Sequence, residues 1–235
     1  MNENETATLA EIANPFDFAN PVSVKTLFIG REQEIKDIEY YLDHTKNAAR
    51  SISLALLGER AAGKTSLLNM IEIEAASRGL IPVRIDLNES DVETHFAFWF
   101  KIFDSILTTV IDEGTPDAKV FGGTTGKTFD TYLDLVTAFE IPDDKTYCPF
   151  LFPVQFAKAM GAGKPLARVS DNMLKRDLKL IATEAGRPIV LLIDECNLLS
   201  AHRALLEMVR NTFMNLPGYM LVFTGTPDLF PVMDE

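Results

Sequence analysis

Hydrophobic residues form two kinds of pattern along this chain: short continuous runs, and sets spaced three or four positions apart. Short apolar runs occupy residues 51–57, 81–87, 189–193 and 219–223, and each predicts a strand, with 51–57 and 189–193 expected to be buried. Residues 31–44, 64–76, 92–110, 170–181 and 201–215 place apolar side chains three or four positions apart, which predicts helices. Apolar strands that alternate with helices indicate a mainly parallel sheet covered on both faces. The pattern therefore predicts an α/β three-layer sandwich.

Four of the predicted helices repeat apolar residues along one face. The longest stripe predicts a helix packed on the sheet; it contains Val92, Phe96, Trp99, Phe103, Ile106 and Val110. The helix at 170–181, capped by Ser170 or Asp171, repeats Leu174, Leu178 and Ile181. The two nearest the N-terminus repeat Ile35, Ile38, Tyr41 and Leu42, and Leu67, Leu68, Ile71 and Ile73.

Two segments interrupt this regularity. Residues 1–27 are rich in Asn, Ala and Pro and predict a linker or a partner-facing arm. Between 113 and 165, glycines, prolines and charges break every pattern longer than one short helix at 129–139. We therefore expect one core domain over 28–235 with an insertion or irregular excursion at about 113–165.

Composition narrows the possible partners. The chain has 235 residues, of which 47% are hydrophobic, enough for one sizeable core. Its net charge of −12 argues against a broad surface for nucleic acid or anionic lipid, so nucleic acid is expected only through regions outside this chain. Without a membrane-spanning run or a signal-like N-terminus, the expected compartment is the cytoplasm. The two cysteines, Cys148 and Cys196, have no zinc-site spacing and predict free thiols.

A glycine-rich loop follows the first predicted strand and precedes a helix. Its sequence, Gly58-Glu59-Arg60-Ala61-Ala62-Gly63-Lys64-Thr65, matches Gly-x4-Gly-Lys-[Ser/Thr]. Backbone N–H groups at a helix N-terminus can cradle phosphates, Lys64 supplies a positive charge, and the Thr65 hydroxyl can ligate Mg²⁺. We therefore predict an ATP site that includes residues 58–65 and Ser66.

Two other segments combine glycine with lysine. Residues 122–128 are one residue short of the motif because Phe121 stands where the first glycine belongs, and residues 161–164 are shorter still. Neither follows an apolar strand, so both are interpreted as turns.

Acidic and hydroxyl residues follow the last two predicted strands. Asp194 and Glu195 end the apolar run at 189–193, where a carboxylate can hold Mg²⁺ and its neighbour can activate water. A solvated acidic turn is the alternative. Thr224-Gly225-Thr226 ends the next strand and could sense the γ-phosphate or the attacking water, unless it is a simple turn before Pro227.

With these motifs, the chain resembles the AAA+ ATPases of the origin-recognition and STAND-related branch. Phe28-Ile29-Gly30-Arg31-Glu32, with Glu34, matches that branch's GRExE box upstream of the phosphate loop. The resemblance implies that Phe28, Ile29 and Arg31 lie over the adenine and that Thr226, or Thr224, is the sensor 1 residue. It also implies the sheet order 2-3-4-1, with a fifth strand beyond.

The chain departs from that family in three ways. No fifth strand, helical lid or sensor 2 arginine follows Glu235, so we expect a fragment of a longer protein or a minimal variant. Family arginine fingers usually lie further along, which leaves Arg203 and Arg210 as weak candidates. Typical STAND proteins place an arginine near sensor 1, whereas the Thr-Gly-Thr-Pro stretch at 224–227 is closer to the transposition-helper and secretion-associated members.

These observations favour a molecular switch that couples ATP binding and slow hydrolysis to assembly or to a partner protein. Glu195, Lys64 and Thr226 would be its catalytic residues, ATP and Mg²⁺ its ligands, and a homo-oligomer or another protein its partner. A sensor in bacterial immunity is one such role. The alternative is a DNA-associated loader or transposition helper, and a small-molecule kinase fits less well because Asp194-Glu195 suits water activation.

Overall fold

The computed structural model describes residues 21–23, 28–47, 52–112 and 170–229. Several predictions concern residues outside these ranges. They are the excursion at 113–165 with its predicted helix, the motifs at 122–128 and 161–164, Cys148, and most of the predicted arm. The elements are α1 (Glu32–Thr45), β1 (Ile52–Leu57), α2 (Lys64–Ser77), β2 (Ile81–Asp86), α3 (Glu89–Val92), α4 (His95–Asp112), α7 (Asp171–Ala185), β3 (Ile189–Asp194), η2 (Cys196–Ala201), α8 (Arg203–Phe213), β4 (Tyr219–Gly225) and η3 (Pro227–Leu229).

Four parallel strands form one sheet in the order β1-β4-β3-β2. Read from the other edge, this is the order 2-3-4-1 that the family resemblance implied. The predicted α/β class with a parallel sheet is thus confirmed, and the described residues contain four of its strands. The register places Asp86 opposite Asp194 and Leu57 opposite Gly225, so the carboxyl ends of the strands meet at one edge of the sheet.

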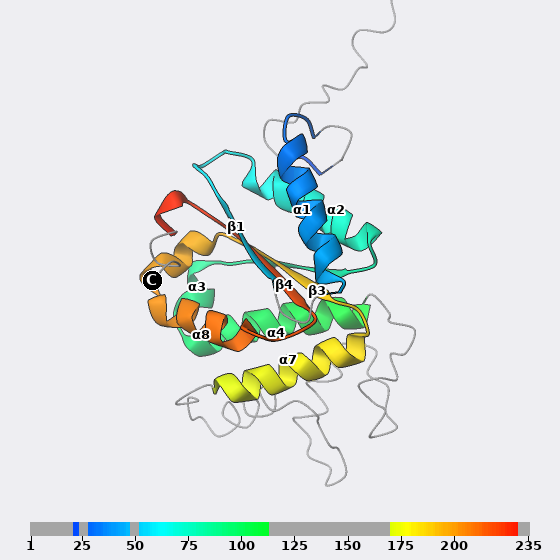
Figure 1. Ribbon diagram of the computed structural model, residues 1–235. Helices are drawn as coiled ribbons and strands as arrows, with labels where there is room; N and C mark the ends of the chain where they lie inside the picture. The colour runs from blue at the N-terminus through cyan, green and yellow to red at the C-terminus, as the bar shows by residue number, and fades with distance from the viewer. Residues whose placement is uncertain (1–20, 24–27, 48–51, 113–169, 230–235) are drawn as a thin grey trace, which may run out of the picture.

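Helices cover both faces of the sheet, as Figure 1 shows. On one face α1 and α2 pack on β3 and β4; on the other, α4, α7 and α8 do so. The alternating side chains of β3 divide between the two layers: Val190 and Leu192 face α1 and α2, whereas Leu191 and Ile193 face α4, α7 and α8. All six residues of β3 are buried, which confirms the predicted burial of residues 189–193 and adds Asp194.

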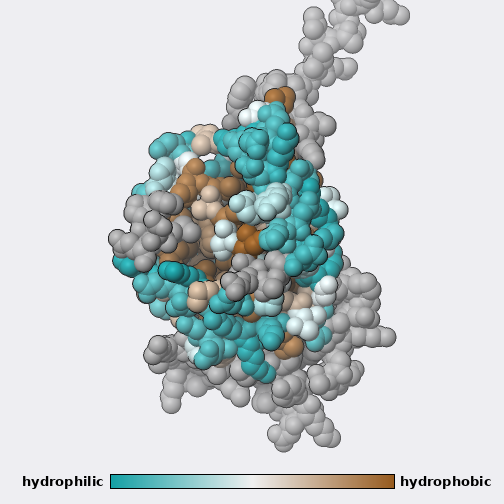
Figure 2. Space-filling model, in the orientation of Figure 1, coloured by the Kyte–Doolittle hydropathy of each residue, from teal (hydrophilic) through white to brown (hydrophobic). Residues whose placement is uncertain are grey.

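Strand β1 is less buried than its apolar sequence predicted. Ser53 and Ala55 are exposed, because β1 is the edge strand of the described sheet and α4, α7 and α8 pack over β2, β3 and β4 instead. Figure 2 shows hydrophobic residues in a hollow near β1 and β4, beside the hydrophilic surface of α1. An apolar run alone did not reveal this edge position.

Two residues of the periodic apolar sets are exposed. Tyr41 is 36% exposed and Ile73 is 39% exposed. In α1 the buried face is formed by Ile38, Leu42 and Thr45, and Tyr41 is one position away from it, which is about 100° around a helix. Ile73 is two positions from the buried Ile71 and so lies on the opposite side of α2.

The long apolar stripe is divided between two helices. Asn88 and Asp91 form a capping box at α3: the Asp91 N–H donates to Asn88 Oδ1 at 3.2 Å, and the Asn88 N–H donates to Asp91 Oδ2 at 2.9 Å. Thr94 Oγ1 then accepts the Ala97 N–H at 3.0 Å and starts α4. The predicted packing is nevertheless confirmed, since every residue of the stripe is buried or packs against the larger core.

The packing of this stripe can be tested by removing one methyl group. Ile106→Val, at a fully buried position, is expected to lower the free energy of unfolding by about 0.5–1.5 kcal/mol, measured by urea denaturation. The same substitution at the exposed Ile73 is the matched control and should cost less. Equal losses at the two positions would contradict the assigned core.

Candidate functional site

The phosphate-binding loop predicted from the sequence runs from the end of β1 to the start of α2. The Gly58 N–H donates to Gly225 O at 3.1 Å, which ties the loop to the end of β4. Gly63 has φ +79° and precedes the first turn of α2, so a residue with a Cβ would be strained there. A Cβ added at Gly58 would lie 3.3 Å from Ala62 Cβ. The curve therefore favours glycine at position 63 through its backbone conformation, whereas a Cβ at position 58 would require a small shift of Ala62.

The side chain of Lys64 folds back into the curve of the loop. Its Nζ donates to Gly58 O at 2.7 Å and to Glu59 O at 2.9 Å. The ammonium group therefore lies where the loop backbone converges, at the N-terminus of α2. An anion at this place would meet a fixed positive charge and the positive end of the helix dipole.

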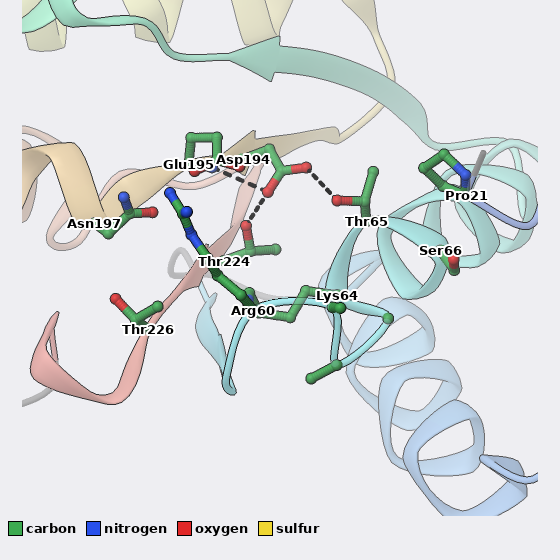
Figure 3. A pocket seen from close by; sticks show the side chains of 13 residues that line it. Pro21, Arg60, Lys64, Thr65, Ser66, Asp194, Glu195, Asn197, Thr224 and Thr226 are labelled. Carbon is green, nitrogen blue, oxygen red and sulfur yellow. Dashed lines mark hydrogen bonds between the residues drawn. The ribbon is translucent and has the colours of Figure 1, made fainter. Parts of the chain in front are cut away.

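A cavity of about 320 Å³ lies between this loop and the carboxyl ends of β3 and β4 (Figure 3). It brings together most of the predicted site residues, which lie far apart in sequence. Arg60 extends from the loop toward the side of the cavity that Glu195 occupies. The described lining consists of Pro21, Arg60, Ala61, Ala62, Gly63, Lys64, Thr65, Ser66, Asp194, Glu195, Asn197, Thr224 and Thr226.

Asp194 is the centre of the polar contacts in this cavity. The residue is only 6% exposed, and it ends β3 facing the start of α2. Thr65 Oγ1 donates to Asp194 Oδ2 at 3.0 Å, while the Thr224 hydroxyl and the Glu195 N–H, the latter at 3.0 Å, donate to Oδ1. A hydroxyl and a carboxylate in contact are oxygen ligands of the kind that Mg²⁺ takes in proteins.

Glu195 adopts a left-handed backbone conformation with φ +57° and ψ +34°. This conformation is uncommon for a residue with a side chain and costs on the order of 1–3 kcal/mol. It separates the directions of two consecutive acids: Asp194 is buried, and Glu195 is exposed and lines the cavity. The pair is therefore not a simple solvated acidic turn, because the first acid is fully engaged.

Thr224 lies near the end of β4 and Thr226 follows the strand, and the two side chains have different surroundings. Thr224 is fully buried and its hydroxyl is bonded to Asp194. Thr226 is half-buried and lines the cavity on the side of Asn197 (Figure 3). Both threonines are therefore among the described residues that line the cavity, Thr226 is the more exposed of the two, and Thr224 orients the carboxylate of Asp194.

The GRExE segment contacts the loop through its arginine. Arg31 Nη2 donates to the carbonyl oxygen of Ala62. Phe28 instead lines a second cavity of about 290 Å³ between α1 and α2, together with Met70 and Glu74, and Ile29 is 77% exposed. Arg31 thus contacts the glycine-rich loop but lines the second cavity, as Phe28 does, and none of Phe28, Ile29 and Arg31 is among the described residues that line the first cavity.

The arginine-finger candidates and the remaining cysteine lie elsewhere. Arg203 pairs with Glu207 at 3.2 Å along α8, and Arg210 is exposed on the same helix; neither is among the described residues that line the cavity. Cys196 has a free thiol in the described structure, and burial raises the pKa of this thiol.

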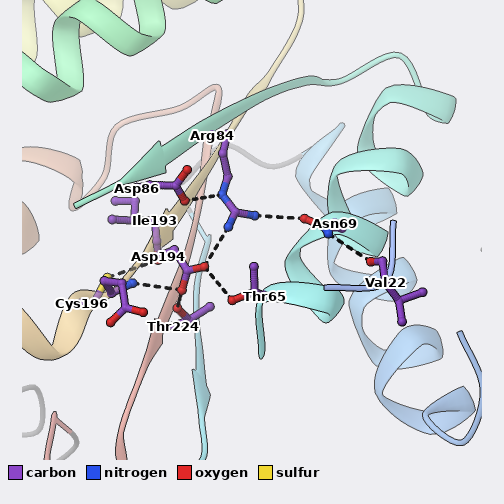
Figure 4. Close-up of polar contacts among 10 residues, drawn as sticks. Val22, Thr65, Asn69, Arg84, Asp86, Ile193, Asp194, Cys196 and Thr224 are labelled. Carbon is purple, nitrogen blue, oxygen red and sulfur yellow. Dashed lines mark hydrogen bonds and ion pairs between the residues drawn. The ribbon is translucent and has the colours of Figure 1, made fainter. Parts of the chain in front are cut away.

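One charged residue of the site was not predicted from the sequence. Arg84, on β2, places Nη2 2.7 Å from Asp194 Oδ2 (Figure 4). The available signal was an arginine in an otherwise alternating apolar strand. Asn69 of α2 contacts both Arg84 and the carbonyl oxygen of Val22, and Ser66 accepts the Val22 N–H at 3.0 Å, so residues 21–23 lie against the start of α2.

Comparison with known proteins does not assign the chain to a family. No protein-family model matches it, and no curated protein is significantly similar to it. Among the described helices, none combines the length and apolar composition needed to cross a bilayer.

Proposed function

We propose that this protein binds Mg-ATP in the cavity between the loop and β3, hydrolyses it slowly, and uses the nucleotide state as a switch. The contact between Thr65 and Asp194 is the observation that carries this proposal. These residues are 129 positions apart, yet the fold joins their oxygens in the cavity that Lys64 also lines. A hydroxyl, a carboxylate and a cation at a helix N-terminus suit the metal and the phosphates of one ligand.

The loop residues would bind the triphosphate. The turn at Gly63 leaves the N–H groups of the first turn of α2 without helical acceptors, so they are free to donate to phosphate oxygens. Lys64 would exchange its contacts to the Gly58 and Glu59 carbonyls for contacts to the β- and γ-phosphates. Thr65 and Asp194 would hold Mg²⁺, which neutralises phosphate charge during transfer.

Glu195 would be the residue that accepts a proton from the attacking water. It lies in the same cavity as Lys64 and Thr226, and its exposed carboxylate can reach water there. An arginine would further stabilise the charge of the transition state. Arg60 lines the cavity and can approach from within the chain; a second copy or a protein partner could supply another.

The proposed switch depends on three chain segments that line the cavity. Its lining includes the loop, Asn197 of η2, and Thr226, the residue before η3. A ligand with different contacts before and after hydrolysis would favour different positions of these segments. Assembly with further copies or with a protein partner would then respond to nucleotide state.

A titration of Mg-ATP into the Thr65→Ala variant tests the proposed role of the contact between Thr65 and Asp194. We expect calorimetry to show saturable binding by the wild type and weaker binding by the variant in Mg²⁺, because one ligand oxygen is lost. In EDTA the two affinities should be similar. Thr183→Ala, an exposed threonine on α7, is the matched control and should bind as the wild type does. Absence of binding by the wild type would refute the proposal.

A further inference from the structure

The positively charged side chain of Arg84 contacts Asp194, the same carboxylate that is proposed to hold Mg²⁺. Its guanidinium has three acceptors: Nη2 lies 2.7 Å from Asp194 Oδ2, Nε lies 2.7 Å from Asp86 Oδ1, and Nη1 lies 3.4 Å from Asn69 Oδ1. These acceptors come from β3, β2 and α2, as Figure 4 shows. A planar group held from three elements is fixed in orientation.

The fold brings Arg84 and Asp194 together through strand pairing. Strands β2 and β3 are adjacent and parallel, with Asp86 opposite Asp194. Arg84, two residues before Asp86, lies on the same face of the sheet as Asp86. The guanidinium is 22% exposed and the Asp194 carboxylate is 8% exposed, so solvent screens this ion pair only in part.

Arg84 and Thr65 share one oxygen of Asp194. Thr65 Oγ1 donates to Oδ2 at 3.0 Å, and Arg84 Nη2 donates to the same atom at 2.7 Å. The second oxygen, Oδ1, is engaged by Thr224 and by the Glu195 N–H. A divalent cation near Thr65 and Asp194 would therefore compete with the guanidinium for Oδ2 and would be repelled by its charge.

We propose that Arg84 is a positioning residue that holds Asp194 in the metal-free protein and sets the Mg²⁺ concentration at which nucleotide binds. This inference rests on the proposed function. Arg84 neutralises Asp194 when no metal is present, which limits the repulsion between this carboxylate and a triphosphate. When Mg²⁺ is present, the same charge opposes it. Arg84 thus favours metal-free nucleotide binding and disfavours the metal-bound state.

Arg84→Met tests this opposition because methionine keeps a long apolar side chain and removes the charge. The probe is a fluorescent ATP analogue, titrated in EDTA and at buffered free Mg²⁺ concentrations. We expect weaker binding in EDTA and a half-saturating Mg²⁺ concentration at least about fivefold lower than in the wild type, the lower end of typical coupling between two ligands. A residue with only a structural role would weaken binding in both conditions.

Arg78→Met is the matched control. Arg78 is also a partly exposed arginine, at 19%, with contacts to Asp43, Glu39 and Glu74, but it lies at the other end of α2 and does not line the cavity. Its replacement should leave the ratio of the affinities with and without Mg²⁺ unchanged. Circular dichroism establishes that each variant is folded.

Arg84→Lys provides a second variant that keeps the charge and loses the planar fork. It should show a change of the same sign as Arg84→Met and of smaller size. An unchanged ratio of affinities in either folded variant, or a higher Mg²⁺ requirement, would overturn the inference. Absence of nucleotide binding by the wild type, with and without Mg²⁺, would instead overturn the proposed function, so the two failures are distinguishable.

Discussion

Lys64→Ala is expected to weaken Mg-ATP binding by roughly 100-fold or more, because hydrogen bonds to charged groups contribute about 1.5–3 kcal/mol each and Lys64 would make more than one. Its ammonium already lies within the loop, 2.7 Å from Gly58 O and 2.9 Å from Glu59 O. Alanine at this position leaves the phosphates without their point charge. Calorimetric titration of Mg-ATP measures the loss.

The control for this variant is Lys179→Ala, which removes an exposed lysine from α7, outside the described lining of the cavity. It should bind Mg-ATP with wild-type affinity, which would exclude a general effect of net charge. The folded state of Lys64→Ala is checked by its far-ultraviolet circular dichroism. An unchanged affinity in the folded Lys64→Ala variant would show that this loop does not bind the phosphates.

Glu195→Gln is expected to retain Mg-ATP binding and to lose turnover by about 10²–10⁴-fold, the usual contribution of a general base. The amide has nearly the same size as the carboxylate but cannot accept the proton of the attacking water. Phosphate release under saturating Mg-ATP measures turnover, and calorimetry measures binding in parallel. The separation of these two effects is the signature of a residue that acts in hydrolysis and not in binding.

Glu207→Gln makes the same change at an exposed position on α8, where Glu207 pairs with Arg203. It should leave both binding and turnover unaltered. Wild-type turnover in Glu195→Gln would place the base elsewhere in the cavity. Loss of binding in Glu195→Gln would show that this carboxylate supports the ligand in place of activating water.

Sequence predicted the features of this fold that depend on local patterns. An uninterrupted apolar run such as that of β3 is favourable only inside a covered sheet, so its burial could be predicted without knowing its neighbours. The edge position of β1 depends on which strands pair and was not predictable from its own residues. The break between α3 and α4 had a local signal, the capping residues Asn88 and Thr94, which the apolar stripe obscured.

The residues of the site also divide into those with a local sequence signal and those brought in by tertiary structure. Gly63, Lys64 and Thr65 belong to one contiguous motif, and Asp194 ends an apolar strand, so sequence predicted that these residues share a site. Arg84 reaches Asp194 only because β2 pairs with β3, a contact across 110 positions. Likewise, the contact of Val22 with Ser66 and Asn69 depends on the path of the chain before α1 and has no sequence signature.

The backbone conformation at Glu195 places the stability of the fold in conflict with the proposed activity. Glycine accepts φ +57° without steric cost, so among substitutions at this position it is the one that would relieve strain. The same change would remove the carboxylate proposed to activate water. Selection for a more heat-resistant protein alone would therefore favour loss of this carboxylate, and a library screened for stability should also be screened for the proposed turnover.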